Sequence, residues 1–399
     1  MIRTTPFYER TKAANTTGLW THWSGYLVAT KYQMSEKFEY FAIRNAAAVY
    51  DSSPLYKYRI RGSGAQRYLA GVLARDITTC RPGRGQYTIW CDDDGYVMED
   101  GVIFCTAENE YLLTAAKPNL AYLQSLIGYD KVEVEDVSAA YASVAVQGPR
   151  SREILAALAP SVRGLAYFEH TETKIGDAPL TVSRTGFTGD LGYELWMDRS
   201  DALRVWDVLF EIGSGHGLVP NGDVALLMAR IEAGLLLVDA DFESSRFAWN
   251  DAHRSTPIEL GLGWMFRNLS KTDRPFIGRE AIRRELAGGP TRWRMIGLVV
   301  DWRDYEQKYS RAGLIPPKDH TPVAEDMMVY DADAKRVGYA TSFMYSPVLQ
   351  RHIALARVRP DLAAPGNEVN LEFTIDHRYE MVAAHTAALP LYDPPRRTA

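Results

Sequence analysis

The chain has 399 residues, of which 46% are hydrophobic and 24% are charged, and its formal net charge is −5. This length predicts two or three domains, and the composition is that of a globular protein. A weakly acidic chain without a dense run of lysine and arginine is not expected to bind nucleic acid.

The N-terminal stretch is polar, and no segment approaches the roughly 18 apolar residues that would cross a bilayer. We therefore expect a cytoplasmic protein without a membrane partner. The three cysteines, Cys80, Cys91 and Cys105, are too few and too scattered for a disulfide framework. Because no Cys-x-x-Cys pair or His-Cys cluster is present, we expect no metal cofactor.

The first part of the chain predicts strands mixed with helices. Residues 81–104 indicate two strands joined by an Asp/Gly turn. Residues 141–159 indicate a strand that leads through Gly148-Pro149 into a helix whose apolar residues repeat at helical spacing. The chain is therefore not a strict alternation of parallel strands and helices.

Three further helices follow, and then the pattern changes to strands. Apolar periodicity predicts helices within residues 199–217, 222–238 and 274–291, while residues 239–257 are polar and aromatic and indicate a long loop. Five β-like segments end the chain: residues 293–301, 336–346, 351–358, 368–374 and 379–389. They predict a small barrel or sandwich, so that the whole chain is α+β.

The segment SRTGFTGDLGYELW, residues 183–196, places glycines at every third position from Gly186 to Gly192. It lacks the Gly-x-Gly-x-x-Gly spacing of a dinucleotide site, and no Gly-Lys-Ser/Thr follows as in a phosphate loop. Strand-like residues flank it on both sides, which predicts a hairpin. The glycines serve either the turn alone or a site that includes Glu194, which shares a strand face with Trp196. A carboxylate there could accept two parallel N–H bonds from a flat ring such as a pterin.

This segment closely resembles the signature of the glycine-cleavage T-protein (aminomethyltransferase) superfamily, whose members bind tetrahydrofolate. Other segments resemble the family in the same order along the chain: residues 48–53, 85–104, 144–155, 229–237, 256–264, 274–282 and 338–358. The resemblance thus covers nearly the whole chain.

The resemblance implies an α+β fold with three domains in a cloverleaf around a central channel that holds the folate. We expect a discontinuous folate-binding core at residues 1–50 and 138–285. A second α+β domain is expected to be inserted at residues 51–137, and a C-terminal β-barrel or sandwich domain is expected at residues 286–399.

The resemblance also implies roles for individual residues. Glu194 matches the glutamate that grips the pterin, and Asp100 matches the key aspartate near N5 of the folate. Tyr87 and Tyr167 match aromatic residues at the folate site. Thr114 stands where glycine-cleavage T-proteins have an asparagine, and we expect it at the folate site too.

The chain departs from the glycine-cleavage proteins in four places, one of which is the segment of residues 239–257, longer than the usual connection of the family. Besides Thr114, two leucines, Leu226 and Leu227, replace a charged pair of the family. The N-terminal residues 18–33 are also unusually aromatic, and the expected substrate contacts there are Trp20, His22, Trp23 and Tyr26, with core packing as the alternative.

The departures resemble the tetrahydrofolate-dependent demethylase branches of the family, such as the vanillate and syringate O-demethylases. The prediction is therefore an enzyme of aromatic catabolism and one-carbon metabolism, a methyltransferase that moves a methyl group from a small methoxy-aromatic acid to N5 of tetrahydrofolate. An aromatic pocket suits such an acid.

The chemistry predicts further residue roles. Asp100 would orient N5 and manage its proton, and the leaving phenoxide needs a proton donor, for which Tyr32, His253 and His22 are candidates in no fixed order. A substrate carboxylate could pair with Arg246 or Arg254, in a loop that could equally be a solvated surface segment.

Alternative functions remain open at this point. One is a demethylase of a small sulfonium or betaine donor, and another is a true aminomethyltransferase. A non-catalytic folate protein of iron–sulfur assembly lacks support because the Lys-Gly-Cys-Tyr motif is missing, and the folate module of an amine dehydrogenase lacks support because no flavin-binding loop is present. No flavin is therefore expected, and the oligomeric state, the donor and the need for a carrier protein are left open.

Overall fold

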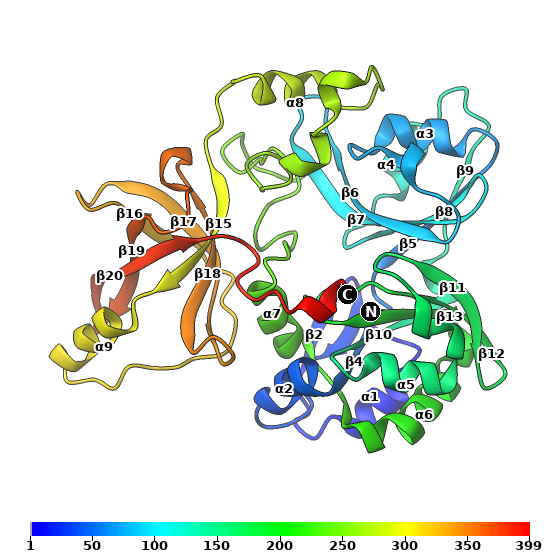
Figure 1. Ribbon diagram of the computed structural model, residues 1–399, viewed down its shortest axis with the longest axis horizontal. Helices are drawn as coiled ribbons and strands as arrows, with labels where there is room; N and C mark the ends of the chain where they lie inside the picture. The colour runs from blue at the N-terminus through cyan, green and yellow to red at the C-terminus, as the bar shows by residue number, and fades with distance from the viewer. Residues whose placement is uncertain (1) are drawn as a thin grey trace.

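The computed structural model describes residues 2–399 and contains four sheets, one of which closes into a barrel. In Figure 1 the barrel forms one lobe, the five-stranded sheet a second, and the six-stranded sheet with the N-terminal elements a third. The mixture of helices and sheets and the closed C-terminal barrel confirm the predicted fold class. The exact domain boundaries stay a prediction.

The six-stranded sheet has the order β11-β12-β13-β10-β4-β14. Its strands are β4 (Ala47–Asp51), β10 (Tyr141–Gln147), β11 (His170–Ile175), β12 (Ala178–Ser183), β13 (Gly192–Asp198) and β14 (Leu218–Pro220). Helices α5 (Ser151–Leu158) and α6 (Ala202–Gly213) share one apolar core with it. The helices cover one face of this sheet, so its other face is available to the rest of the molecule (Figure 1).

The N-terminal residues add a small sheet and helices to this lobe. The sheet has the order β1-β3-β2 and consists of β1 (Arg3–Thr4), β2 (Trp20–Trp23) and β3 (Tyr26–Ala29). The helices are α1 (Tyr8–Ala14), α2 (Lys37–Asn45) and, later in the chain, α7 (Asp223–Glu232). Helix α7 ends at Glu232, earlier than the apolar run of residues 222–238 suggests, and the chain turns at Gly234 with φ of 65°.

The five-stranded sheet has the order β6-β7-β8-β5-β9. Its strands are β5 (Tyr56–Arg61), β6 (Arg84–Cys91), β7 (Val97–Ala107), β8 (Glu110–Ala115) and β9 (Glu133–Asp136). Helices α3 (Ala65–Val72) and α4 (Leu120–Ser125) pack on one face of it. The predicted hairpin of residues 81–104 is confirmed as the antiparallel pair of β6 and β7.

The C-terminal barrel closes in the order β15-β18-β17-β16-β19-β20. The strands are β15 (Arg294–Val300), β16 (Met327–Tyr330), β17 (Arg336–Ser346), β18 (Arg351–Val358), β19 (Glu368–Ile375) and β20 (Arg378–Ala387). Five of the six were expected from the sequence, while β16 and helix α9 (Trp302–Arg311) were not. Helix α8 (Arg279–Leu286) precedes the barrel, as predicted.

A buried ionic network connects α2, α7, the glycine-rich segment and the C-terminal tail. Arg44 of α2 pairs with Glu232 of α7 at 2.6 Å and with Asp190 of the glycine-rich segment at 3.4 Å. Arg396, near the C-terminus, pairs with the same Asp190 at 2.7 Å. Glu232 also accepts a hydrogen bond from Ser346 of the barrel. The Arg44 pairs are thus buried within the lobe of the six-stranded sheet, and the Ser346 hydroxyl and Arg396 connect the barrel and the C-terminal tail to them.

No helix in residues 2–399 is long and apolar enough to cross a membrane.

Candidate functional site

The glycine-rich segment lies between β12 and β13, which pair antiparallel as predicted. A Cβ atom at Gly186 would lie 2.0 Å from the side chain of Gln147, and one at Gly192 would lie 2.2 Å from it. Gly189 has a φ of 67° and lies against Ala233. The glycines therefore serve both a turn and the close packing of this segment around one buried amide.

Replacing Gly192 by alanine should lower the free energy of unfolding by about 1–3 kcal/mol, because the new methyl group overlaps Gln147. Urea denaturation checks this. Gly164→Ala is the matched control, since no atom lies within 4 Å of its added Cβ. Equal stability of the two variants would contradict the packing role of Gly192.

Glu194 lies on the sheet face that the helices leave uncovered. A cross-strand row runs from Tyr50 of β4 through Ala145 of β10 and Glu194 of β13 to Ser183 of β12. The hydroxyl of Thr185 donates to Oε2 of Glu194, and no donor in the described residues is bonded to Oε1. The Glu194 side chain is half-buried. The row thus presents one carboxylate oxygen that is free to accept a hydrogen bond.

The environment acts on the charge of Glu194 in two directions. Burial raises the pKa of its carboxyl group, whereas the Thr185 hydrogen bond and the positive charge of Lys57 lower it. A buried carboxylate with a nearby cation is suited to a ligand that offers N–H donors.

Asp100 lies on β7 and is half-buried. The hydroxyl of Tyr87 on β6 donates to Oδ2 of Asp100 at 2.8 Å, so two of the predicted site residues are in direct contact. Glu99 is buried on the opposite face and accepts hydrogen bonds from the backbone N–H groups of Asp100 and Lys117. Burial raises the pKa of both carboxyl groups, and Asp100 is the one that solvent reaches.

The five- and six-stranded sheets meet face to face beside these carboxylates. Phe104 of β7 and Trp196 of β13 contact each other with ring centroids 5.9 Å apart. Since side chains alternate along a strand, Asp100 shares a face with Phe104, and Glu194 shares a face with Trp196. Both carboxylates therefore project from the sheet faces that oppose each other.

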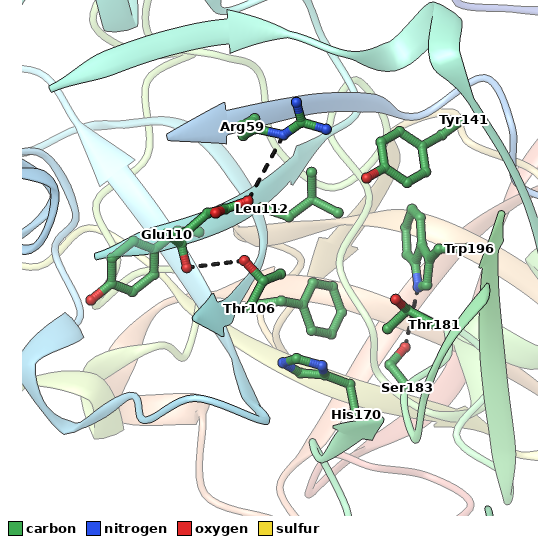
Figure 2. A pocket seen from close by; sticks show the side chains of 11 residues that line it. Arg59, Thr106, Glu110, Leu112, Tyr141, His170, Thr181, Ser183 and Trp196 are labelled. Atoms are coloured by element: carbon green, nitrogen blue, oxygen red, sulfur yellow. Dashed lines mark hydrogen bonds and ion pairs between the residues drawn. The ribbon is translucent and has the colours of Figure 1, made fainter. Parts of the chain in front are cut away.

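A cavity lies at the far side of this contact (Figure 2). Trp196, Ser183 and Thr181 line it from one sheet, and Arg59 and Leu112 line it from the other. Its volume of about 50 Å³ suffices for one or two water molecules and excludes a folate. The cavity touches Ser183, the neighbour of Glu194, and includes neither predicted carboxylate.

Two other predicted folate contacts lie in different settings. The hydroxyl of Thr114 is bonded to the backbone N–H and carbonyl of Val102, so it stabilises the pairing of β7 and β8. Tyr167 is half-buried beside Phe168, with ring centroids 4.7 Å apart, and lies close to Arg397 of the C-terminal tail. Their contact with folate stays a prediction.

The aromatic N-terminal residues do not form a single group. The ring of Trp23 lies 6.1 Å from that of Tyr50, the first residue of the Glu194 row, and Trp23 packs in the same cluster as Phe187 and Leu226. This cluster of Trp23, Tyr50, Phe187 and Leu226 is called the aromatic wall below.

The other aromatic residues of this region lie apart from the aromatic wall. Trp20 packs on Tyr8 at 5.4 Å, His22 is exposed, and Tyr26 is half-buried. Of the four N-terminal residues expected to contact substrate, only Trp23 lies in the cluster that adjoins the Glu194 row.

The candidate proton donors and arginines are also separated. Tyr32 is 3% exposed, and its phenol is in contact with Thr11. His253 is exposed and lies 3.5 Å from Glu243 within the loop of residues 239–257. In the described residues neither side chain is hydrogen-bonded to Asp100 or Glu194.

Arg246 and Arg254 belong to the same loop. Arg246 is exposed and lies over the ring of Phe247. Arg254 is paired with Asp251 at 3.3 Å and lies over the ring of Tyr96 in the β6–β7 turn. The loop itself is anchored to the strand of Asp100, because Val97 exchanges backbone hydrogen bonds with Ser245 and Ser255.

Comparison with known proteins identifies the architecture. A family model described as the GCVT N-terminal domain matches residues 7–269, and the model of the glycine cleavage T-protein C-terminal barrel domain matches residues 310–393. The chain belongs to the glycine-cleavage T-protein family. The sequence-based resemblance is thereby confirmed, except that the O-demethylase branch is not part of this finding.

Individual members of the T-protein family resemble the chain over nearly its whole length. It is 31% identical to an aminomethyltransferase of Geobacillus kaustophilus, with 90% of each chain covered, and 32% identical to one of Streptomyces coelicolor, with 93% of each covered. It is also 29% identical to the heme-dependent oxidative N-demethylase gamma subunit of Ectopseudomonas mendocina, covering 94% of this chain and 92% of that one.

A solved structure supports the same fold. The glycine cleavage system aminomethyltransferase T from Bartonella henselae superimposes with a TM-score of 0.82 at 21% identity, with 98% of this chain and 99% of that chain covered. The family is enzymatic, and its aminomethyltransferases use tetrahydrofolate.

Two residues of the site were missed by the sequence reasoning. The sequence alone does not single out Tyr50, although its place opposite Ala145 puts it in the Glu194 row. Lys57 was not noted at all. Its alternation with the core residues Tyr58 and Ile60 is the signal of a solvent-facing position, yet Lys57 is fully buried.

Proposed function

We propose that this T-protein family member is a tetrahydrofolate-dependent methyltransferase that demethylates a small methoxy-aromatic acid. The observation that carries the proposal is the aromatic wall, which joins Trp23 of the N-terminal sheet to Tyr50 of the Glu194 row. Apolar and aromatic side chains around a few polar groups favour an aromatic ligand.

The residues present fit a reduced folate. Glu194 has one carboxylate oxygen without a donor, which supports a grip on the N–H edge of the pterin, and Asp100 is held by Tyr87 with its other oxygen unbonded in the described residues. When bound, tetrahydrofolate supplies the nitrogen N5 that accepts the methyl group.

The residues of the chain would then position the reactants and manage one proton. Glu194 fixes the orientation of the ring, and Asp100 holds the proton that N5 gives up. Methyl transfer would break the methyl–oxygen bond of the donor, and the phenoxide that leaves would need a proton. Tyr32, His253 and His22 remain proposals for this donor: His253 is exposed in a loop, His22 is exposed on strand β2, and Tyr32 lies in the core.

Substitution of Glu194 by glutamine should weaken tetrahydrofolate binding by about 100-fold, because charge-assisted hydrogen bonds contribute about 1.5–3 kcal/mol each. Calorimetric titration measures the loss. Glu172→Gln is the control, since Glu172 is an exposed residue of the same sheet. Equal affinities of the Glu194 variant and the control would contradict the assignment.

A donor panel tests the function itself. The protein is incubated with tetrahydrofolate and with methyl-¹³C-labelled methoxybenzoates, betaine or dimethylsulfoniopropionate, and the product is examined for labelled 5-methyltetrahydrofolate. We expect label transfer from a methoxybenzoate. Label transfer only from betaine or the sulfonium compound would show that the proposed donor class is wrong, while methyl transfer to tetrahydrofolate would stand.

A second candidate function is that of an aminomethyltransferase, and the relatives that carry this name support it. An aminomethyl-lipoyl carrier is therefore included in the panel. Release of ammonia from this carrier, with no methyl transfer from any other donor, would favour the second candidate.

A further inference from the structure

Lys57 is a fully buried lysine between the two sheets that carry the candidate site. It lies on β5 opposite Thr114 of β8, on the sheet face that bears Phe104. Its Nζ donates to the carbonyl oxygens of Ser53 at 2.9 Å and Leu55 at 2.7 Å. The amine is thus fixed in one position, with a hydrogen left for the neighbouring sheet.

That neighbouring sheet presents Trp196 and two carboxylates to Lys57. Nζ lies 5.7 Å from the ring centroid of Trp196 on β13. The carboxylates whose negative charge raises the pKa of Lys57 are Asp51 of β4, Glu194 of β13 and Asp136 of β9. In the described residues Lys57 is the one cation whose charge lowers the pKa of Glu194.

The two other carboxylates have fixed partners of their own. Asp51 accepts hydrogen bonds from the Thr5 hydroxyl at 2.6 Å and from the Ser53 backbone at 3.0 Å. Asp136 is exposed and accepts from Ser138. Glu194 has only Thr185 on one oxygen and must stay an acceptor on the other if it is to bind N–H donors.

We propose that Lys57 is a positioning residue, whose ammonium group keeps Glu194 in the carboxylate form that accepts hydrogen bonds from the pterin. The effect on folate binding rests on the proposed function. A protonated Glu194 would direct its O–H group toward the N–H donors of the pterin and could not accept a hydrogen bond from them there. An opposite charge nearby is the arrangement that offsets the cost of burying a carboxylate.

The pH range of the effect follows from the charge states of both groups. Burial lowers the pKa of Lys57 to about 7, so its ammonium form and its support of Glu194 are present below about pH 7 and are lost as the pH rises through that value. Burial raises the pKa of Glu194, so removal of Lys57 should let Glu194 become protonated at a higher pH than in the wild type. Replacing Lys57 should therefore affect Glu194 most at pH values below about 7.

A titration without folate tests the electrostatic part. The wild type, Lys57→Met and Lys57→Arg are labelled with ¹³C at the glutamate carboxyl carbon, and the Glu194 resonance is assigned with Glu194→Gln. Lys57→Met should raise the pKa of Glu194 by about one pH unit or more, and Lys57→Arg should restore it. Unchanged titration in Lys57→Met would overturn the proposal. Lys174→Met, at an exposed lysine, is the control.

Reciprocal coupling keeps the test valid if Lys57→Met does not fold. The wild type and Glu194→Gln are then labelled at the lysine Cε, and loss of the Glu194 carboxylate should lower the pKa of Lys57. An unchanged Lys57 resonance titration would again overturn the proposal.

Folate binding tests the consequence. At pH 6 Lys57→Met should bind tetrahydrofolate more weakly than the wild type, with a smaller difference at pH 8.5. A loss of equal size at both pH values would indicate a purely structural role and overturn the proposal. Absence of binding by the wild type would instead refute the proposed function, while the two resonance titrations would still decide the role of Lys57.

Discussion

Replacing Asp100 by asparagine should lower the rate of methyl transfer by about 100- to 10,000-fold, the range that positioned acid–base groups contribute. The substitution keeps the shape of the side chain and its contact with the Tyr87 hydroxyl, but it removes the group that takes the proton from N5. Affinity for tetrahydrofolate should change much less, because Glu194 provides the grip. Single-turnover kinetics and calorimetry separate the two quantities.

The pH dependence of the rate provides an internal check. Burial raises the pKa of Asp100, and a base works only when it is ionised, so the rate of the wild type should fall as the pH drops through a value well above that of an ordinary aspartate. This acidic limb should disappear in Asp100→Asn. Tyr87→Phe is the matched variant that keeps the carboxylate and should lower the rate less. A rate for Asp100→Asn within a few-fold of the wild type would exclude Asp100 from the chemistry.

Replacing Arg44 by methionine should lower the free energy of unfolding by about 3–5 kcal/mol, because removal of one partner leaves buried charges uncompensated. Arg44 is 2% exposed and hydrogen-bonds to Glu232, to Asp190 and to the backbone carbonyls of Thr188 and Ala229. The loss should also loosen the glycine-rich segment, since Asp190 belongs to it. Urea and thermal denaturation measure the effect.

Arg10 supplies the control for Arg44. It pairs with Asp207 at 2.6 Å, but both side chains are exposed, so Arg10→Met should change the stability little. If Arg44→Met were as stable as Arg10→Met, the buried network could not be a main source of stability.

The sequence was sufficient to predict the elements with a strong local pattern. The hairpin around residues 183–196 follows from alternating strands on either side of three glycines, and the same alternation correctly placed Glu194 beside Trp196 on one face. The length of the barrel strands made five of them recognisable. In each case the signal lies within a few residues of the chain.

The missed elements lack such a signal. Strand β16 has only four residues. Helix α9 has the sequence WRDYEQKYSR, in which seven residues are polar or charged, so the segment resembles an exposed loop. Its start is marked by Asp301, whose side chain accepts a hydrogen bond from the backbone N–H of Asp304. Its buried residue Tyr305 packs on the barrel, which is a tertiary contact.

The residues of the candidate site also differ in how far the sequence predicts them, because some of their contacts lie within one hairpin and others lie between separate sheets. Asp100 and Tyr87 come from paired strands, so their contact follows from hairpin register. The meeting of Trp23 with Tyr50, and the burial of Lys57 between two sheets, depend on how separate sheets pack against each other. Such packing cannot be deduced from the periodicity of any one strand, and it also separates Tyr32, His253 and the two arginines, which the sequence had grouped by chemistry alone.

Calorimetric titration of the wild-type protein with tetrahydrofolate tests the central claim most directly. The account predicts saturable binding of one tetrahydrofolate per chain, which weakens as the pH falls through the pKa of Glu194. Absence of binding heat at any pH between 6 and 9 would contradict it.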